Sequence, residues 1–256
     1  MNGLGNWMQQ YGIVAYKVFS ATDASDLPLG WIEPREFSLD GVVFYDGHKM
    51  ILFTDVVHSV LVKDKKTQTK DIGELQDWID KRFTDKDAPY TLVSYGSRKF
   101  DAPLLHSEYD IPHTVGQVDL REMISDASKE HHGESYGRRY DLRSLSVLNN
   151  AKQTAIPHLS FLMKPIELLA EWKRGMERNV LKTLAAEVEL IAELYCTIMA
   201  REELRIIDQR TERPATVQCD FVRDTALYRF IPDEKELDSK TKEYREKLIV
   251  EDESNA

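Results

Sequence analysis

The stretch that decides the fold is residues 92–105, which read LVSYGSRKFDAPLL. It begins within a short apolar β-run, Thr91–Ser94, and continues through a loop that contains Gly96. It ends in a segment that predicts a helix over 100–109, with Asp101 close to the helix start. The stretch therefore predicts a strand, a loop and a helix in direct succession.

The segments before this stretch predict a sheet. Residues 12–20 are rich in β-forming apolar residues, which suits a buried central strand. Two more strands are predicted over 37–45 and 50–54, and the AspGlyHis between them is a strong signal for an antiparallel hairpin. Residues 71–83 have apolar side chains at helical spacing, so a helix is predicted there.

The segments after it predict another strand and a long helix. A short strand is predicted over 116–120, and a mixture of helix and polar loop over 120–148. The longest helical pattern covers 178–205. Residues 206–232 look β-rich, and the rest predicts a charged helix that ends in an acidic tail.

This order of elements predicts an α/β fold with a mixed sheet flanked by helices. The expected domain covers residues 1–205, and residues 206–256 form a small C-terminal extension. The 256 residues are 42% hydrophobic and 30% charged, which is enough to bury a core without disulfides or metals.

Charge and cysteine content narrow the classes of function. The net charge of −10 argues against general, tight binding of nucleic acid, because such binding depends on basic surfaces. Cys196 and Cys219 cannot make a disulfide framework or a four-ligand zinc site. No signal-peptide pattern or long apolar run is present in the sequence, so we expect a cytoplasmic protein that does not bind a membrane.

Three segments resemble motifs of the DnaQ-like, or DEDD, 3′–5′ exonucleases. Residues 92–105 resemble the second exonuclease motif, and Val118–Arg121 is similar to the strand and helix start that follow it. Residues 177–195 are similar to the helix of the third motif. The resemblance covers roughly residues 10–200 and implies a ribonuclease H-like fold.

The same resemblance implies a degenerate catalytic site. Members of this family hold two divalent ions with four acidic residues, because such ions prefer carboxylate oxygens. Here Lys17 and Phe19 align with the Asp and Glu of the first strand, while Asp101 matches its family position. Glu187 stands at the position of the last Asp, and Thr183 replaces the residue that orients the attacking water.

Electrostatics indicate that this set of residues does not support catalysis. Unit charges ~4 Å apart interact by about 4 kcal/mol at an effective dielectric constant near 20, so a lysine in place of a carboxylate repels a divalent ion. Phenylalanine offers no ligand atom. We therefore expect no resident metal or other cofactor. We predict that Lys17 forms an ion pair with Asp101, with Glu187 as a candidate for a second ion pair.

Simpler explanations exist for the surviving acids. Asp101 could be a helix N-cap, and Glu187 could be a partly exposed helix acid. In an active enzyme dependent on Mg²⁺ or Mn²⁺, acids from loops would have to replace the lost ligands. The candidates are Asp23, Asp26 and Asp55, although loop acids seldom hold metals rigidly.

Basic residues that could contact nucleic acid are Arg98 and Lys99 in the second motif, and Arg138 and Arg139 near Tyr136.

The favoured hypothesis is an inactive exonuclease-like domain that binds or scaffolds a protein or a nucleic acid. The alternatives are an active exonuclease with a divergent set of acids, and a structural subunit that binds no nucleic acid.

Overall fold

The structure of the chain is a computed structural model. It describes residues 2–27, 33–56, 67–83, 90–97, 99–112, 115–132, 141–150, 162–208 and 211–218.

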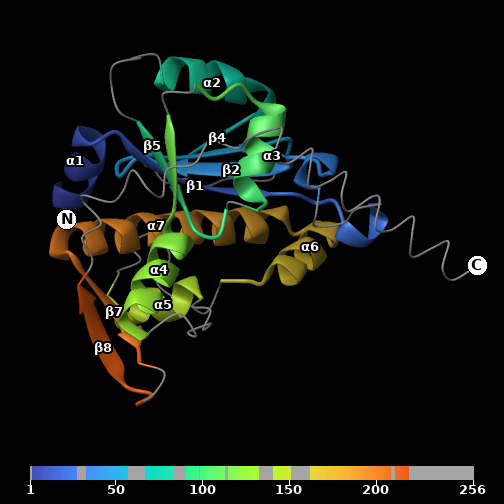
Figure 1. Ribbon diagram of the computed structural model, residues 1–256. Helices are drawn as coiled ribbons and strands as arrows, with labels where there is room; N and C mark the ends of the chain where they lie inside the picture. Colours follow the sequence, from blue (N-terminus) through green and yellow to red (C-terminus); the bar gives the residue numbers. More distant parts are fainter. Residues whose placement is uncertain are drawn as a thin grey trace, which may run out of the picture.

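A six-stranded mixed sheet forms the centre of the molecule, with the strand order β4-β3-β2-β1-β5-β6 (Figure 1). Strand β2 is antiparallel to β1 and β3, whereas the pairs β1–β5, β5–β6 and β3–β4 are parallel. The predicted mixed sheet and the β2–β3 hairpin are therefore confirmed. The strands are β1 (Ile13–Phe19), β2 (Gly41–Tyr45), β3 (Met50–Thr54), β4 (Thr67–Lys70), β5 (Thr91–Ser94) and β6 (Gly116–Asp119).

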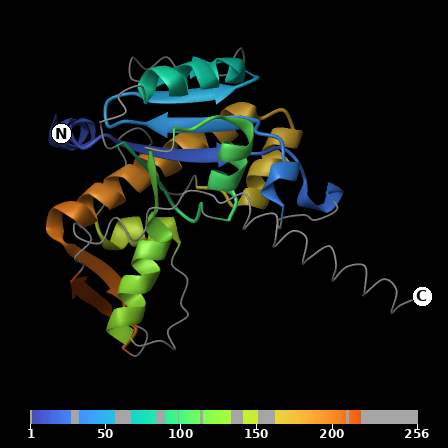
Figure 2. The same cartoon turned by 45° about the horizontal axis from the view of Figure 1, so that its top comes forward.

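Helices cover both faces of this sheet. The long helix α7 lies along one face, while α2 and α3 lie on the other (Figures 1 and 2). The α-helices are α1 (Asn2–Gln10), α2 (Leu75–Arg82), α3 (Asp101–Glu108), α4 (Leu120–His132), α5 (Leu142–Leu148), α6 (Pro165–Lys173) and α7 (Glu177–Arg201). Short 3₁₀ turns are η1 (Ala24–Asp26), η3 (Pro34–Glu36) and η5 (Ile72–Glu74).

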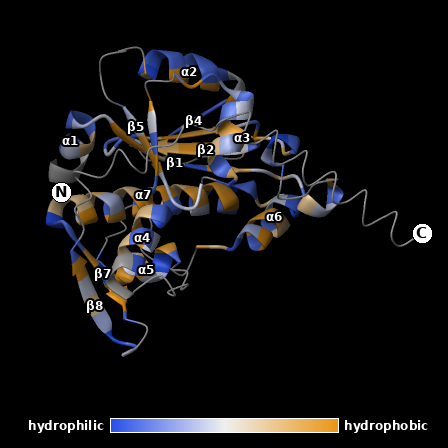
Figure 3. Cartoon of the chain, in the orientation of Figure 1, coloured by the Kyte–Doolittle hydropathy of each residue, from blue (hydrophilic) through white to orange (hydrophobic). Residues whose placement is uncertain are grey.

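The sheet separates two apolar cores, because successive residues of a strand point to opposite faces. On β1, Ala15 and Phe19 belong to the core under α7, whereas Val14 and Tyr16 belong to the core under α2 and α3. Figure 3 shows this as a band of hydrophobic strands between helices that are hydrophobic on their inner sides. Lys17 is therefore a charged residue on the α7 side of a strand that is otherwise buried.

Some elements differ from the prediction. Strand β2 begins at Gly41 and not at residue 37, because η3 precedes it and Phe37 packs edge-on against Phe100 in the core. The predicted helix over 71–83 begins as the 3₁₀ turn η5, and α2 follows it. Neither α1, β4 nor α6 was predicted. Strand β4 was missed because its sequence, TQTK, lacks the apolar alternation that predicts a strand. None of its four residues is buried.

The strands β7 (Glu203–Ile207) and β8 (Pro214–Gln218) form a second, two-stranded sheet. Strand β8 lies within 206–232, the region expected to be β-rich, and β7 overlaps the start of that region. Leu204, Ile206 and Val217 are buried in the same core cluster as α7. The expected domain boundary between residues 205 and 206 thus falls inside β7. The charged helix and acidic tail predicted at the end of the chain lie outside the described residues.

Asn149, which follows α5, ties the hairpin to the main body. Its side-chain amide donates to the carbonyl oxygen of Arg205 over 3.0 Å and accepts from the Arg205 backbone nitrogen over 2.8 Å. We expect Asn149→Ala to lower the free energy of unfolding by about 1–2 kcal/mol, because both backbone groups lose their partner. Urea denaturation measures this change. The exposed Thr216→Ala on β8 is the control, and equal stability of both variants would contradict the prediction.

Helix α1 packs closely on the turn between β2 and β3. A Cβ atom at Gly5 would lie 2.5 Å from the carbonyl oxygen of Gly47, which is closer than such atoms can approach. We expect Gly5→Ala to cost about 1–2 kcal/mol of stability, although alanine is the better helix former. Thermal denaturation measures the loss. Gly41→Ala is the control, since its Cβ would meet the flexible Leu181 side chain at 3.4 Å.

Candidate functional site

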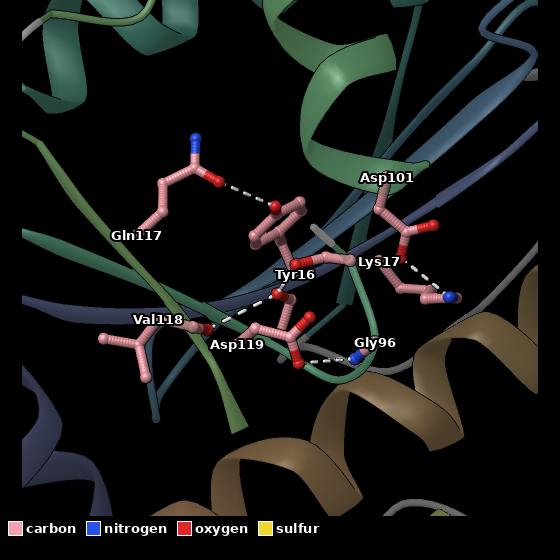
Figure 4. Close-up of polar contacts among 9 residues, drawn as sticks. Tyr16, Lys17, Gly96, Asp101, Gln117, Val118 and Asp119 are labelled. Atoms are coloured by element: carbon pink, nitrogen blue, oxygen red, sulfur yellow. Dashed lines mark hydrogen bonds and ion pairs between the residues drawn. The ribbon is translucent and has the colours of Figure 1, made fainter. Parts of the chain in front are cut away.

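An ion pair between Lys17 and Asp101 lies at the centre of the candidate site. The Lys17 Nζ is 2.7 Å from Asp101 Oδ2, and the two residues are 84 positions apart in the sequence. In Figure 4 the two side chains point toward each other from β1 and from the start of α3. The side chains are 22% and 4% exposed, so the pair is largely shielded from water. The predicted ion pair between these residues is confirmed.

The strand order brings these two residues together. Strand β1 is the parallel neighbour of β5, and the chain leaves β5 through a loop that leads into α3. Asp101 is the first residue of α3, but Phe100 occupies the N-cap position and makes no side-chain capping bond. The alternative that Asp101 caps this helix is therefore wrong: its carboxylate pairs with Lys17.

Glu187 of α7 is the second carboxylate near Lys17. Burial alone would lower the pKa of Lys17, but the charges of Asp101 and Glu187 outweigh burial and raise it. Lys17 is therefore a fixed cation at neutral pH. No direct ion pair or hydrogen bond of Glu187 is found within the described part of the chain, so Asp101 is the closer partner of Lys17.

Burial also changes the pKa values of the two acids. It raises the pKa of Asp101, and the Lys17 ammonium offsets part of this rise. Burial raises the pKa of Glu187 to about 7, a rise that Lys17 opposes and Asp101 reinforces. Glu187 is half-buried, so the expectation of a partly exposed helix acid is correct for its exposure but misses its electrostatic contact with Lys17.

Phe19 lies two residues beyond Lys17 on the same face of β1. It is buried, and its ring centroid is 4.9 Å from that of Trp172 on α6. The position aligned with a metal-binding Glu is thus part of an apolar contact with a helix that was not predicted. Thr183 of α7 is also buried, and its hydroxyl donates to the carbonyl oxygen of Asn179 over 3.0 Å, as helical threonines commonly do.

Asp119, which ends β6, is another buried carboxylate close to the site, and sequence reasoning missed its role. It accepts a hydrogen bond from the backbone nitrogen of Gly96 over 2.7 Å (Figure 4). It accepts a second one from the backbone nitrogen of Arg121 over 2.9 Å. Gly96 has φ +72, a conformation that glycine adopts readily. Asp119 therefore holds the loop after β5 in the shape that leads into Asp101. Its place at a strand end before a helix was the available signal.

A buried hydrogen-bond network lies on the opposite face of β1. The Tyr16 hydroxyl donates to Gln117 Oε1 over 3.0 Å (Figure 4). The Gln117 amide nitrogen contacts His106 Nε2. Burial raises the pKa of Tyr16, and the nearby Asp101 charge adds to the effect, so the hydroxyl stays neutral. Ser94 and Ser97 share a further hydrogen bond beside this network. These contacts fix the polar groups beneath the site.

Of the other predicted residues, Lys99 and Asp23 do not join this cluster. Lys99 is exposed in the turn before α3, while Arg98, Arg138 and Arg139 lie outside the described residues. Asp23 pairs with Lys173 over 2.9 Å, and hydrogen bonds from Lys173 and Ser25 hold its pKa at about 2.

The described ranges contain neither a metal-binding cluster nor a membrane-spanning helix. Within residues whose positions are described, no group of three or more His, Cys, Asp or Glu side chains is arranged to hold a metal ion. In the same part of the chain, no helix is both long enough and apolar enough to cross a membrane. The candidate site thus consists of the Lys17 ammonium and the carboxylates of Asp101, Glu187 and Asp119, of which Asp101 is in direct contact with Lys17.

A comparison with known protein families finds no family model that matches this chain, and a comparison with curated proteins finds no match.

Proposed function

We propose that this chain is a ribonuclease H-like domain, related to the DnaQ-like 3′–5′ exonucleases, that has lost hydrolysis and acts by binding a partner. The observation that carries the proposal is the ion pair between Lys17 and Asp101. The motif resemblance predicted that residues 17, 101 and 187 would share one site. Their convergence from β1, α3 and α7 supports that alignment.

The residues at the site do not fit a two-metal centre. A divalent ion bound to Asp101 would sit about 2.0–2.6 Å from its oxygen, and the Lys17 ammonium is already 2.7 Å from Oδ2. The ion would have to displace this ammonium or tolerate its repulsion. Phe19 supplies no oxygen, and its ring is held by Trp172. We therefore propose no metal-dependent step for this protein.

Charge favours a protein as the partner over a nucleic acid. The charges that act on Lys17 come from three carboxylates, those of Asp101, Glu187 and Asp119. A phosphate that approached the ammonium would meet these negative groups as well, and the whole chain carries a net charge of −10. A scaffolding role toward a protein partner is therefore the function that this site supports best.

A nuclease assay tests the loss of hydrolysis. Labelled single-stranded DNA and RNA are incubated with the full chain and Mg²⁺ or Mn²⁺, and no cleavage is expected. An Asp101→Ala variant purified in the same way is the control for contaminating nucleases. Cleavage by the wild type that disappears in Asp101→Ala would overturn the proposal.

Binding is tested separately by titrating the same polymers at low salt. We expect no binding that weakens with salt in the way that phosphate contacts require. Tight, salt-dependent binding without cleavage would retain the inactive domain but replace the protein partner by a nucleic acid.

A further inference from the structure

Five polar side chains on the α3 side of the sheet form one hydrogen-bond network. Tyr16 is fully buried, and its hydroxyl donates to Gln117 Oε1 over 3.0 Å (Figure 4). The amide nitrogen of Gln117 contacts Nε2 of His106, a half-buried residue of α3. At the other end, the hydroxyls of Ser94 and Ser97 bond to each other, and both are hydrogen-bond partners of Tyr16. This set, the His106 network, connects a half-buried histidine with the loop after β5.

The order of donors and acceptors in the His106 network fixes the protonation of the histidine. An amide nitrogen donates and cannot accept, so Nε2 of His106 accepts from Gln117. His106 is therefore neutral in this arrangement, with its proton on Nδ1. The oxygen of the same amide accepts from Tyr16 and faces away from the histidine. A proton added to Nε2 would place two donors against each other.

A second arrangement of the same groups satisfies a protonated His106. When the Gln117 amide turns over, its oxygen accepts from His106 and its nitrogen donates to Tyr16. The Tyr16 hydroxyl then donates to Ser97, whose own proton goes to Ser94. The Ser94 hydroxyl ends the network on a backbone carbonyl oxygen of β6, 3.4 Å away. The hydroxyl and imidazole donors thus have acceptors in both arrangements, which avoids the cost of unpaired buried groups.

Ser97 connects this network to the start of α3. Its carbonyl oxygen accepts from the backbone nitrogens of Phe100 over 3.1 Å and Ala102 over 3.0 Å, the residues on either side of Asp101. Ser97 is buried, so the protein and not bulk water supplies the partners of its hydroxyl. A change of partner at that hydroxyl therefore acts on the loop that holds Asp101. The charge of Asp101 also acts directly on Tyr16.

The charged groups around His106 come from the elements that pack against α3, which include β1 and η3. Lys17 pairs with Asp101, and Glu33 pairs with Arg35 over 2.7 Å. The other charged side chains on these elements, on α3 and on β6 are those of Glu36, Glu108 and Asp119. Carboxylates outnumber cations in this set, so a protonated His106 lies in a favourable potential.

We infer that the His106 network is a proton-controlled switch that couples His106 to the Lys17–Asp101 pair. The structure shows the neutral form, and uptake of one proton reverses the direction of the hydrogen bonds along the network. Two satisfied arrangements that differ by one proton are what a pH-sensitive switch requires. The inference depends neither on exonuclease ancestry nor on the loss of hydrolysis, because it rests on the network alone.

NMR spectroscopy of the full, isotope-labelled chain tests the switch. Multiple-bond correlations between the protons and nitrogens of the imidazole ring should show neutral His106 with its proton on Nδ1. The carboxyl carbon signal of Asp101 is then followed between about pH 5 and pH 8, where histidines titrate. It should shift in step with His106. The titration is recorded in a Glu187→Gln background, so that Glu187, whose pKa is raised to about 7, does not contribute.

Two variants, made in the same background, test the connection between the histidine and the site. Tyr16→Phe keeps the ring and removes the hydroxyl, so the shift of Asp101 that follows His106 should be lost. His106→Gln should abolish the same shift, because it removes the titrating group. The matched control is Tyr11→Phe, which deletes a hydroxyl from a tyrosine that is 51% exposed and should leave the coupling unchanged.

Three results would overturn the inference. The first is a neutral His106 with its proton on Nε2, and the second is an Asp101 signal that does not follow the titration of His106. The third is a coupling that survives Tyr16→Phe as fully as it survives Tyr11→Phe. Cleavage or binding of nucleic acid changes none of these readouts, so failure of the switch is distinguishable from failure of the proposed function.

Discussion

Replacing Lys17 by methionine is expected to lower the free energy of unfolding by about 2–4 kcal/mol at neutral pH. Methionine has a similar length, but it leaves the Asp101 carboxylate, which is 4% exposed, without its counter-ion. A buried charge that loses its partner is costly, and the 22% exposure of the Lys17 side chain moderates the loss. Chemical denaturation followed by circular dichroism measures the change.

A double-mutant cycle isolates the pair from other effects of the substitution. Asp101→Asn keeps the shape of the side chain and removes its charge, so Lys17→Met should cost at least ~1 kcal/mol less in that background. The loss caused by Lys17→Met alone should also shrink at low pH, because burial raises the pKa of Asp101 and the acid can take up a proton. Equal losses in both backgrounds would show that the pair contributes no stability.

Buried strands were the most predictable elements of this fold. Residues 50–54 and 91–94 were predicted as strands, and β3 and β5 have the same bounds. Both are apolar segments between turn-forming residues. Their residues are buried on both faces of the sheet, so the strands can be identified from apolar sequence alone. Strand β4 is different, since TQTK pairs with β3 through backbone groups at the edge of the sheet. Its strand character depends on its neighbour and not on its side chains.

The site was predictable to the extent that it follows from strand order. Lys17 and Asp101 were expected to meet because the motif resemblance implied the positions of their elements, and they do. The place of Asp119 before a helix start hints at its bond from the Arg121 nitrogen, but its bond from the Gly96 nitrogen joins distant segments, which no residue pattern encodes. The contact of Phe19 with Trp172 joins segments far apart in the sequence, so it could be found only from the packed structure.

Glu187→Gln is expected to stabilise the protein at alkaline pH. Burial raises the pKa of Glu187 from its ordinary value of 4.5 to about 7. A carboxyl group that binds its proton more tightly in the folded state stabilises the fold at low pH, and this contribution is lost as the pH rises from 4.5 to about 7. Glutamine carries no charge at any pH, so the variant should be more stable than the wild type by about 1–3 kcal/mol at pH 8.

The pH dependence of this difference identifies its cause. Urea denaturation measures the free energy of unfolding of both proteins between about pH 5 and pH 8, the range in which protonation of Glu187 is coupled to folding. The stability gained by Glu187→Gln should shrink toward zero at the acidic end of this range. The control is the matched substitution Glu108→Gln at the exposed end of α3. If Glu187→Gln is instead less stable at pH 8, the attraction between ionised Glu187 and Lys17 outweighs burial. Lys17 would then neutralise two carboxylates at once, and removing it should cost more than its contact with Asp101 alone explains.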